Sequence, residues 1–440
     1  MVDRRSEIGS PAWIESFQRK LQDRARLGRY TRLRSVSPSL PEFVPGNQAF
    51  YLHDGQLHLD WMVAAIESAR YRVDLEMYIF SNDESGRRVR DALVHAAKRG
   101  VVVRVLYDSI GSGEAGHSFF QPLVEAGARV VEFNPVAPWR LRMGRLGRTQ
   151  HWQPNNRDHR KLLVCDTPVS WARASYREGE VPCCPEPDDP DRGAIAITGG
   201  RNIGDEYLGA PLGAGQWRDC GVVIFGPVVR HLGELFDAMW FHAEGPDVEP
   251  PRIDSERVGD LTILPIGSQP GFMNLLSWAL SRMAATIRSE LRISCAYFIP
   301  SARWRRSLAA AARRTGRCLI LLPKSSDVAM VDRASRHLWG RLLDAGVEIY
   351  RYSRGVLHEK TLVYDKTVTV VGSSNLDPRS FRLNYELSVI IVGASFAAPV
   401  VAWHEGDLAS AERYTLALWR DRPWLERLGD WLWSLLRSQL

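Results

Sequence analysis

Two short segments of the chain carry the same pattern of a histidine, a lysine and an aspartate. The first runs from His159 to Asp166 and the second from His358 to Asp365, and both fit HxKxxxxD. Residues two apart in an extended strand point to the same face, so each histidine and lysine can project into one cavity. The candidate catalytic residues are therefore His159, Lys161, Asp166, His358, Lys360 and Asp365.

A glycine and an asparagine follow each segment, in Thr198 to Asn202 and in Val371 to Asn375. Glycine lets a backbone approach closely, and asparagine offers donors to a phosphate, so we expect Asn202, Asn375 and Ser374 to bind phosphate oxygens. Displacing an alcohol from a phosphodiester needs a nucleophile, an acid for the leaving oxygen and cations for the phosphate charge. Two histidines and two lysines supply that set, so neither a metal nor another cofactor is expected.

The elements that must position these residues occur twice along the chain. Each half is expected to contain a strand, a helix, a second strand, a second helix and a third strand. The expected elements are 71–80, 89–99, 101–107, a helix ending at 127, and 128–133 in the first half, and 291–300, 308–314, 318–322, a helix ending at 346, and 347–350 in the second. This alternation predicts an α/β fold of two similar domains, each a mostly parallel or mixed sheet flanked by helices.

The domain boundaries are set by changes in composition. We expect an N-terminal extension over 1–45, a first domain over 46–245, a second over 246–422 and a C-terminal amphipathic segment over 423–440. The boundary between the domains falls in the proline-rich and acidic stretch 245–251. The segment 167–192 has no counterpart in the second half, so it is interpreted as an exposed insertion.

Several further runs of sequence resemble the phospholipase D superfamily. The resemblance extends from about residue 48 to about residue 420, and among the members of the superfamily the cardiolipin synthases are the most similar. These runs are YIFSND at 78–83, WRD at 217–219, YFIP at 297–300, LPKSSD at 322–327 and GSSNLDPRSF at 372–381. The resemblance implies that both motifs meet in one active site between two domains related by a pseudo-twofold axis. The run Gly199 to Asn202 departs from the Gly-Ser-x-Asn of many members. No leading transmembrane helix is read, so the chain is most similar to the shorter, soluble subtype.

The resemblance also implies a mechanism. A phosphatidyl group would pass to phosphatidylglycerol through a phosphatidyl-histidine, and cardiolipin would form. His159 would attack while His358 serves as acid and then as base, or the two roles would be exchanged. Asp219 and Glu386, one in each half, would orient the histidines, and Asp166 and Asp365 would anchor local structure.

The formal charge of +6 and the pI of about 9.0 favour anionic partners without choosing among them. No secretory signal is read, and no run approaches the roughly 18 to 20 apolar residues of a membrane span. We therefore expect a peripheral protein on the cytoplasmic side of the cell membrane. The candidate lipid-facing residues are Trp139, Arg140, Arg142, Arg145 and Arg148, although a solvated basic loop explains them equally well.

The expected partners are phospholipid substrates, namely phosphatidylglycerol and also phosphatidylethanolamine, together with an anionic membrane surface; no nucleic acid is expected. Three alternatives stay open: a phospholipase that uses water, a nuclease, and a non-catalytic module that binds polyanions. Short nucleases of the superfamily carry one motif per chain and dimerise, so two motifs in one chain count against a nuclease. Intact histidines and lysines in both motifs count against the non-catalytic module.

Overall fold

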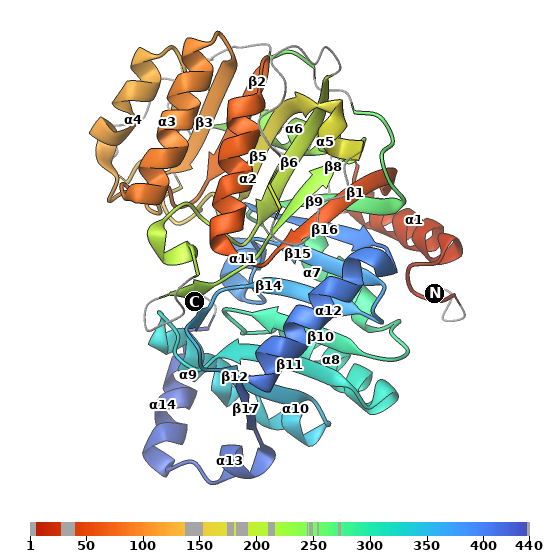
Figure 1. Ribbon diagram of the computed structural model, residues 1–440. Coiled ribbons are helices and arrows are strands. Elements are labelled where there is room, and N and C mark those ends of the chain that lie inside the picture. Colours follow the sequence, from red (N-terminus) through yellow and green to blue (C-terminus); the bar gives the residue numbers. More distant parts are fainter. Residues whose placement is uncertain are drawn as a thin grey trace.

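The computed structural model describes residues 6–27, 40–136, 153–173, 180–181, 192–209, 216–243, 245, 250–252, 255–271 and 274–437. A single sheet of 15 strands runs through both halves (Figure 1). Its first-half strands are β1 (Val44–Leu52), β2 (Arg72–Met77), β3 (Val102–Asp108), β4 (Arg129–Phe133), β5 (Lys161–Pro168), β6 (Arg192–Gly199) and β8 (Gly221–Phe225). Its second-half strands are β9 (Leu261–Ser268), β10 (Leu291–Cys295), β11 (Cys318–Pro323), β12 (Glu348–Tyr352), β14 (Lys360–Tyr364), β15 (Val368–Gly372), β16 (Glu386–Val392) and β17 (Ala411–Tyr414).

The strand order is β17-β12-β11-β10-β14-β15-β16-β9-β1-β8-β6-β5-β2-β3-β4. Apart from the edge strand β17, the second half mirrors the first about the antiparallel β1–β9 pair. This mirrored order is the structural form of the repeat expected from the sequence. A separate two-stranded ladder joins β7 (Trp217–Arg218) to β13 (Val356–Leu357), so it also connects the halves.

Parallel pairing is confined to β2-β3-β4 and to β10-β11-β12, and the other ladders of the large sheet are antiparallel. The sheet is thus mixed. Because β5 runs antiparallel to β2, its first residue pairs with the last residue of β2, as Lys161 does with Met77. Lys360 pairs with Cys295 in the same way. Both motifs therefore begin at the carboxyl ends of the parallel strands, the edge where open α/β sheets bind ligands.

Helices cover both faces of the sheet (Figure 1). In the first half these are α2 (Gly55–Ser68), α3 (Glu84–Lys98), α4 (Gly116–Glu125), α5 (Val169–Arg173) and α6 (Val228–His242). In the second half they are α7 (Leu275–Ala284), α8 (Ala302–Thr315), α9 (Ala329–His337), α10 (Gly340–Asp344), α11 (Pro378–Arg382), α12 (Ala394–Ala409), α13 (Leu416–Arg420) and α14 (Trp424–Leu435). Side-chain caps fix the start of the repeated helices: Asp83 accepts from the Gly86 N–H of α3, and Ser301 accepts from the Trp304 N–H of α8.

The segment expected to be an N-terminal extension contains α1 (Pro11–Leu27), which packs on the second half. Trp13, Phe17 and Leu21 are fully buried, and the Phe17 ring lies 6.0 Å from the ring of Trp278 in α7. The helix α1 is therefore part of the second half's core. Most of the predicted linker, 246–249, lies outside the described residues.

Candidate active site

The two HxK segments alternate between faces as extended strands do. The residue between each histidine and lysine turns away from them into the interior, where Arg160 approaches a carboxyl group and Glu359 approaches a guanidinium. Arg160 Nη1 lies 3.9 Å from Glu76 Oε1, and Glu359 Oε2 lies 3.4 Å from Arg218 Nη1. Each histidine and lysine is thereby left on the shared face at the carboxyl edge of the sheet.

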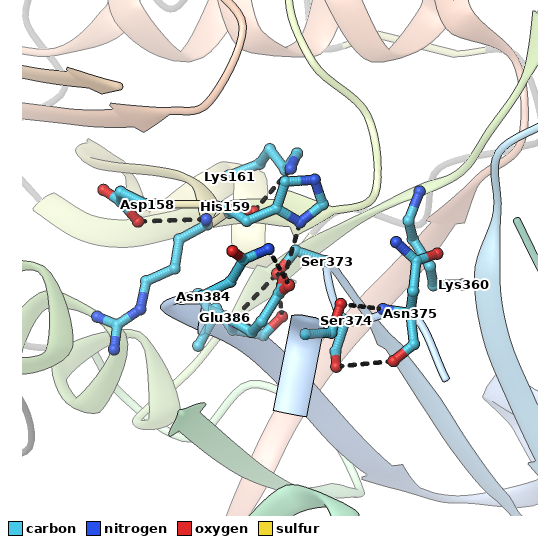
Figure 2. Close-up of polar contacts among 12 residues, drawn as sticks. Asp158, His159, Lys161, Lys360, Ser373, Ser374, Asn375, Asn384 and Glu386 are labelled. Carbon is cyan, nitrogen blue, oxygen red and sulfur yellow. Dashed lines mark hydrogen bonds and ion pairs between the residues drawn. The ribbon is translucent and has the colours of Figure 1, made fainter. Parts of the chain in front are cut away.

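Each histidine is oriented by a carboxylate from the opposite half of the chain. His159 Nδ1 lies 3.0 Å from Glu386 Oε2, as Figure 2 shows, and His358 Nδ1 lies 2.6 Å from Asp219 Oδ2. Backbone hydrogen bonds connect the same segments of the two halves. The His159 N–H donates to the Tyr385 carbonyl at 2.9 Å, and the His358 N–H donates to the Arg218 carbonyl at 2.8 Å. An acceptor on Nδ1 fixes the tautomer and leaves Nε2 for chemistry.

The lysines lie against their own histidines. Lys161 Nζ donates to the His159 carbonyl at 2.6 Å, and its ammonium lies 5.0 Å from the centre of the Tyr78 ring. Lys360 Nζ lies 2.8 Å from His358 Nδ1 and 3.0 Å from His358 Nε2. Both ammonium groups are thus held where a bound phosphate would meet a histidine and a cation together.

The buried setting shifts the pKa values of both histidines. Burial lowers the pKa of His358 to about 4, with the charges of Lys360 and Lys161 acting in the same direction. Burial also lowers the pKa of His159, and Lys161 and Lys360 lower it further. The lysine of each motif thus lowers the pKa of the other motif's histidine. Both imidazoles are neutral at neutral pH in the free protein.

The lysine and carboxylate pKa values shift as well. Burial lowers the pKa of Lys161 to about 7. Burial raises the pKa of Glu386, but His159, Lys161 and the Ser373 hydroxyl outweigh it, and the net shift is downward. For Asp219, likewise, Lys360, His358 and Arg201 outweigh burial and lower the pKa. Both orienting carboxylates are therefore ionised.

The candidate phosphate-binding asparagines hold the loops that follow β2 and β10. Asn202 Oδ1 accepts from the Ile79 N–H at 3.2 Å, and its amide donates to the Tyr207 hydroxyl at 2.7 Å. Asn375 Oδ1 accepts from the Tyr297 N–H at 3.3 Å, and no other side-chain bond of Asn375 occurs within the described residues. The Ser374 hydroxyl donates to the Asn375 carbonyl at 3.2 Å.

The motif aspartates are not brought to the histidines. Asp166 lies toward the far end of β5 and accepts backbone N–H groups of Arg70, Tyr71 and Arg72 at 3.1, 2.9 and 2.8 Å. Asp365 follows β14 and accepts those of Arg288, Ser289 and Glu290 at 2.7, 2.7 and 3.0 Å. Each carboxylate thus holds the turn that leads into β2 or β10. The structure thus places neither aspartate beside a histidine, and we propose that both anchor these turns.

A family model described as "Cardiolipin synthase, PLD-like domain" matches residues 62–240 and 281–408. The chain belongs to this family. It is 30% identical over 387 residues to the cardiolipin synthase of Alkalihalophilus pseudofirmus, covering 86% of this chain and 69% of the relative. It is also 30% identical over 403 residues to the major cardiolipin synthase ClsA of Bacillus subtilis, covering 90% of this chain and 76% of the relative.

This member of the cardiolipin synthase family also shares its fold with a solved structure at low sequence identity. The phosphatidylserine synthase of Haemophilus influenzae aligns with a TM-score of 0.63 at 12% identity, covering 94% of this chain and all of that one. At this identity the likeness speaks for the fold alone, and it supports the architecture of two phospholipase D-like halves.

At the Gly-Gly departure, Gly200 lies against one of the carboxylates that contact the histidines. A Cβ on Gly200 would lie 2.4 Å from Asp219 Oδ1, so a side chain here would require that carboxylate to move. Asp219 Oδ1 instead accepts the Cys220 N–H at 2.7 Å. In the second half the equivalent residue is Ser373, whose hydroxyl donates to Glu386.

Sequence reasoning assigned no role to several residues that support the site. Besides Ser373, Asn384 donates to Glu386 Oε1 at 3.4 Å. Trp217 packs beside His358 with ring centres 4.7 Å apart, and Tyr78 packs beside His159 at the same distance. Tyr78, Trp217 and Ser373 lie within the runs that resemble the family, but the residue type alone does not say which residues contact the histidines or their carboxylates.

The candidate lipid-facing residues lie outside the described residues; they are Trp139, Arg140, Arg142, Arg145 and Arg148. Within the described ranges, no group of three or more His, Cys, Asp or Glu side chains is placed to hold a metal ion. None of the helices that the structure describes is both long enough and apolar enough to cross a membrane.

Proposed function

We propose that this protein makes cardiolipin by transferring a phosphatidyl group from one phosphatidylglycerol to a hydroxyl of a second, through a phosphatidyl-histidine. The observation that carries the proposal is the pair of crosswise His–carboxylate contacts, His159 with Glu386 and His358 with Asp219, in a member of the cardiolipin synthase family. They supply two imidazoles, each held by a carboxylate, and a two-step displacement at phosphorus needs a nucleophile and an acid–base group of this kind.

His159 is assigned as the nucleophile. Within the described residues, its Nε2 has no hydrogen-bond partner, whereas Nε2 of His358 lies 3.0 Å from Lys360 Nζ. A neutral imidazole with a free Nε2 can attack phosphorus, and one beside an ammonium is suited to exchange a proton. Lys161, Lys360, Asn202 and Asn375 are the proposed partners of the phosphate oxygens, with Ser374 supporting Asn375.

In the first step, Nε2 of His159 forms a bond to phosphorus, and the bond from phosphorus to the glycerol oxygen breaks. His358 gives its proton to that oxygen, and glycerol leaves. The bound phosphate anion favours protonated His358, because a nearby opposite charge raises the pKa of an imidazole. In the second step, His358 takes the proton of an incoming phosphatidylglycerol hydroxyl, whose oxygen attacks phosphorus and releases His159.

The substrates place the protein at a membrane. We propose that it works as a peripheral protein on the cytoplasmic side of the cell membrane and takes phosphatidylglycerol, with phosphatidylethanolamine as a second donor. Its net charge of +6 supports attraction to an anionic surface.

Lipid analysis of purified protein incubated with phosphatidylglycerol vesicles, with and without phosphatidylethanolamine, tests the proposal. Cardiolipin should form with the unmodified chain and with His117→Ala, a matched control whose side chain is 62% exposed. It should be absent with His159→Ala and His358→Ala. Phosphatidic acid as the sole product would identify a phospholipase, and no lipid turnover would lead to assays with nucleic acids.

A further inference from the structure

A second cationic cavity lies at the C-terminal end of the molecule, where α8, α9, α10, α13 and α14 meet. It has a volume of about 570 Å³ and is lined by five arginines, Arg305, Arg341, Arg422, Arg427 and Arg437, and by His337. Leu338, Trp419, Leu428 and Trp431 complete the lining. It belongs to neither HxK motif, and the proposed reaction uses none of these side chains.

The positive charge of this cavity is only partly balanced. Arg422 pairs with Asp430, which also accepts from Arg336 at 3.0 Å. Within the described residues, no acidic side chain pairs with Arg341, Arg427 or Arg437. Burial lowers the pKa of Arg305, and the like charges of Arg437, Arg341 and Arg306 lower it further. An anion bound among these guanidinium groups would relieve their repulsion.

The helix that borders the cavity has an exposed apolar face. The residues of this face are Trp424, Leu425, Leu428, Trp431, Leu432 and Leu435, whose exposed fractions range from 43% to 69%. Their spacing of three and four residues places them along one side of α14. Leu428 and Trp431 also line the cavity, so the apolar face and the cationic cavity are continuous.

The other side of α14 is fixed to the body of the protein. Asp430 is 1% exposed and binds Arg336 of α9, while Trp433 packs on the cluster of Ile299, Val331, Ala334 and Leu338. Figure 1 shows α14 lying alongside α9 at the lower left of the molecule. The apolar face is thus held outward on a rigid element.

We propose that this cavity binds the phosphate group of an anionic phospholipid while the apolar face of α14 lies in the membrane interface. Guanidinium groups match phosphate oxygens in geometry and charge. A helix with Trp and Leu on one side, flanked by arginines, has the composition of an interfacial helix. A phospholipid is the ligand that presents an anionic phosphate directly beside hydrocarbon.

The cavity also adjoins the region of the proposed reaction. Arg305 and Arg437 line a neighbouring cavity of about 400 Å³ whose wall includes Asp377 and Pro378. Asp377 lies two residues after Asn375, one of the proposed phosphate ligands. A membrane held at α14 would therefore present lipid on the side of the molecule that leads toward the active site.

The inference rests on the proposed function in one respect, that the membrane supplies the substrate, but its test needs no turnover. Sedimentation should measure binding of the full chain to phosphatidylcholine vesicles and to vesicles of phosphatidylcholine mixed equally with phosphatidylglycerol. In the double variant Arg341→Gln, Arg437→Gln, binding to the anionic vesicles should fall about fivefold for each arginine removed. Lys98→Gln, Arg129→Gln is the matched control: both side chains are exposed in the first half, and the same charge is removed.

A second variant tests the apolar face. Leu432→Gln, Leu435→Gln should weaken binding to the anionic vesicles without changing the thermal melting of the chain, because both side chains are at least half exposed. The proposal is overturned if the arginine variant binds like its control. It is also overturned if the leucine variant changes the oligomeric mass in solution while vesicle binding stays the same, since the face would then be an interface between two copies.

Conversion of phosphatidylglycerol in neutral detergent micelles separates the two proposals. If the arginine variant and the unmodified chain make cardiolipin equally in micelles and differ only on vesicles, both proposals hold. If neither makes cardiolipin in micelles, the proposed function fails, and the vesicle-binding result still decides the inference about α14.

Discussion

At the scale of single residues, charge balance explains why this site can hold two lysines and two histidines with little water around them. Each imidazole has one ionised carboxylate, and each carboxylate has further donors: Ser373 and Asn384 for Glu386, and the Cys220 N–H for Asp219. Buried ions persist only when they are paired and hydrogen-bonded in this way. The site is therefore organised before a phosphate arrives.

The pKa of Lys161 leads to a prediction about pH. Burial lowers this pKa to about 7, so in the free protein the ammonium loses its charge as the pH rises through neutrality. Since kcat/KM reports the free enzyme, we expect kcat/KM for phosphatidylglycerol to fall above a pH of about 7. A guanidinium stays charged, so Lys161→Arg should move this fall to higher pH, even if its maximal rate is lower. Steady-state kinetics over a pH series measure the effect.

The control for this prediction is Lys98→Arg, which changes an exposed lysine of α3 and should leave the pH profile unchanged. An alkaline fall at the same pH in Lys161→Arg and in the unmodified chain would assign the titration to another group. Lys360 would then be the next candidate, because burial lowers its pKa as well.

At the scale of elements, the turns into β2 and β10 are each held by a motif aspartate. Asp166→Ala removes the acceptor of three backbone N–H groups, at Arg70, Tyr71 and Arg72. We expect it to lower the free energy of unfolding by about 1–3 kcal/mol, since buried donors lose their partner. The kcat of the protein that remains folded should stay close to that of the unmodified chain. Urea unfolding and assays at low temperature measure the two quantities.

A matched control is Asp91→Ala, because the Asp91 side chain is 54% exposed and should contribute little to stability. The anchoring role would be wrong if Asp166→Ala lowered kcat a hundredfold with unchanged unfolding. That outcome would return Asp166, and by symmetry Asp365, to the chemical step.

Elements and motifs were predictable from the sequence to different degrees. The repeated strand–helix–strand units correspond to β2, α3 and β3 and to β10, α8 and β11, since their periodicity is local. The crosswise contacts are not local: Glu386 lies 227 residues from His159, and Asp219 lies 139 residues from His358. Which carboxylate meets which histidine depends on how the halves dock, and no spacing in one half contains that information.

The antiparallel strands and α1 were harder to predict for the same reason. A strand that follows a long connection can enter the sheet in either direction, and β5 enters antiparallel to β2. The apolar residues of α1 predict an amphipathic helix at most, but not that it packs on α7 in the other half of the chain.

At the scale of the whole molecule, the two halves share one sheet and one buried cluster. The sheet is continuous through β1 and β9, and one buried cluster contains residues from both halves, among them Val222, Ile263 and Val389. Each half also supplies the carboxylate that contacts the motif histidine of the other half. Separate domains joined by a linker would share neither a sheet nor a core, so the two halves should not unfold independently.

We therefore expect calorimetry of the full chain to give a single unfolding transition. Leu93→Ala and Leu308→Ala create cavities in the separate cores of the first and second halves, where both side chains are fully buried. Each should destabilise the chain by about 2–5 kcal/mol and move the whole transition to lower temperature, because neither half can melt without the other. Ile110→Ala, at a side chain that is 49% exposed, should shift it little. Two transitions, of which only one moves in each variant, would show that the halves are independent domains and that their contacts across the active site form after folding.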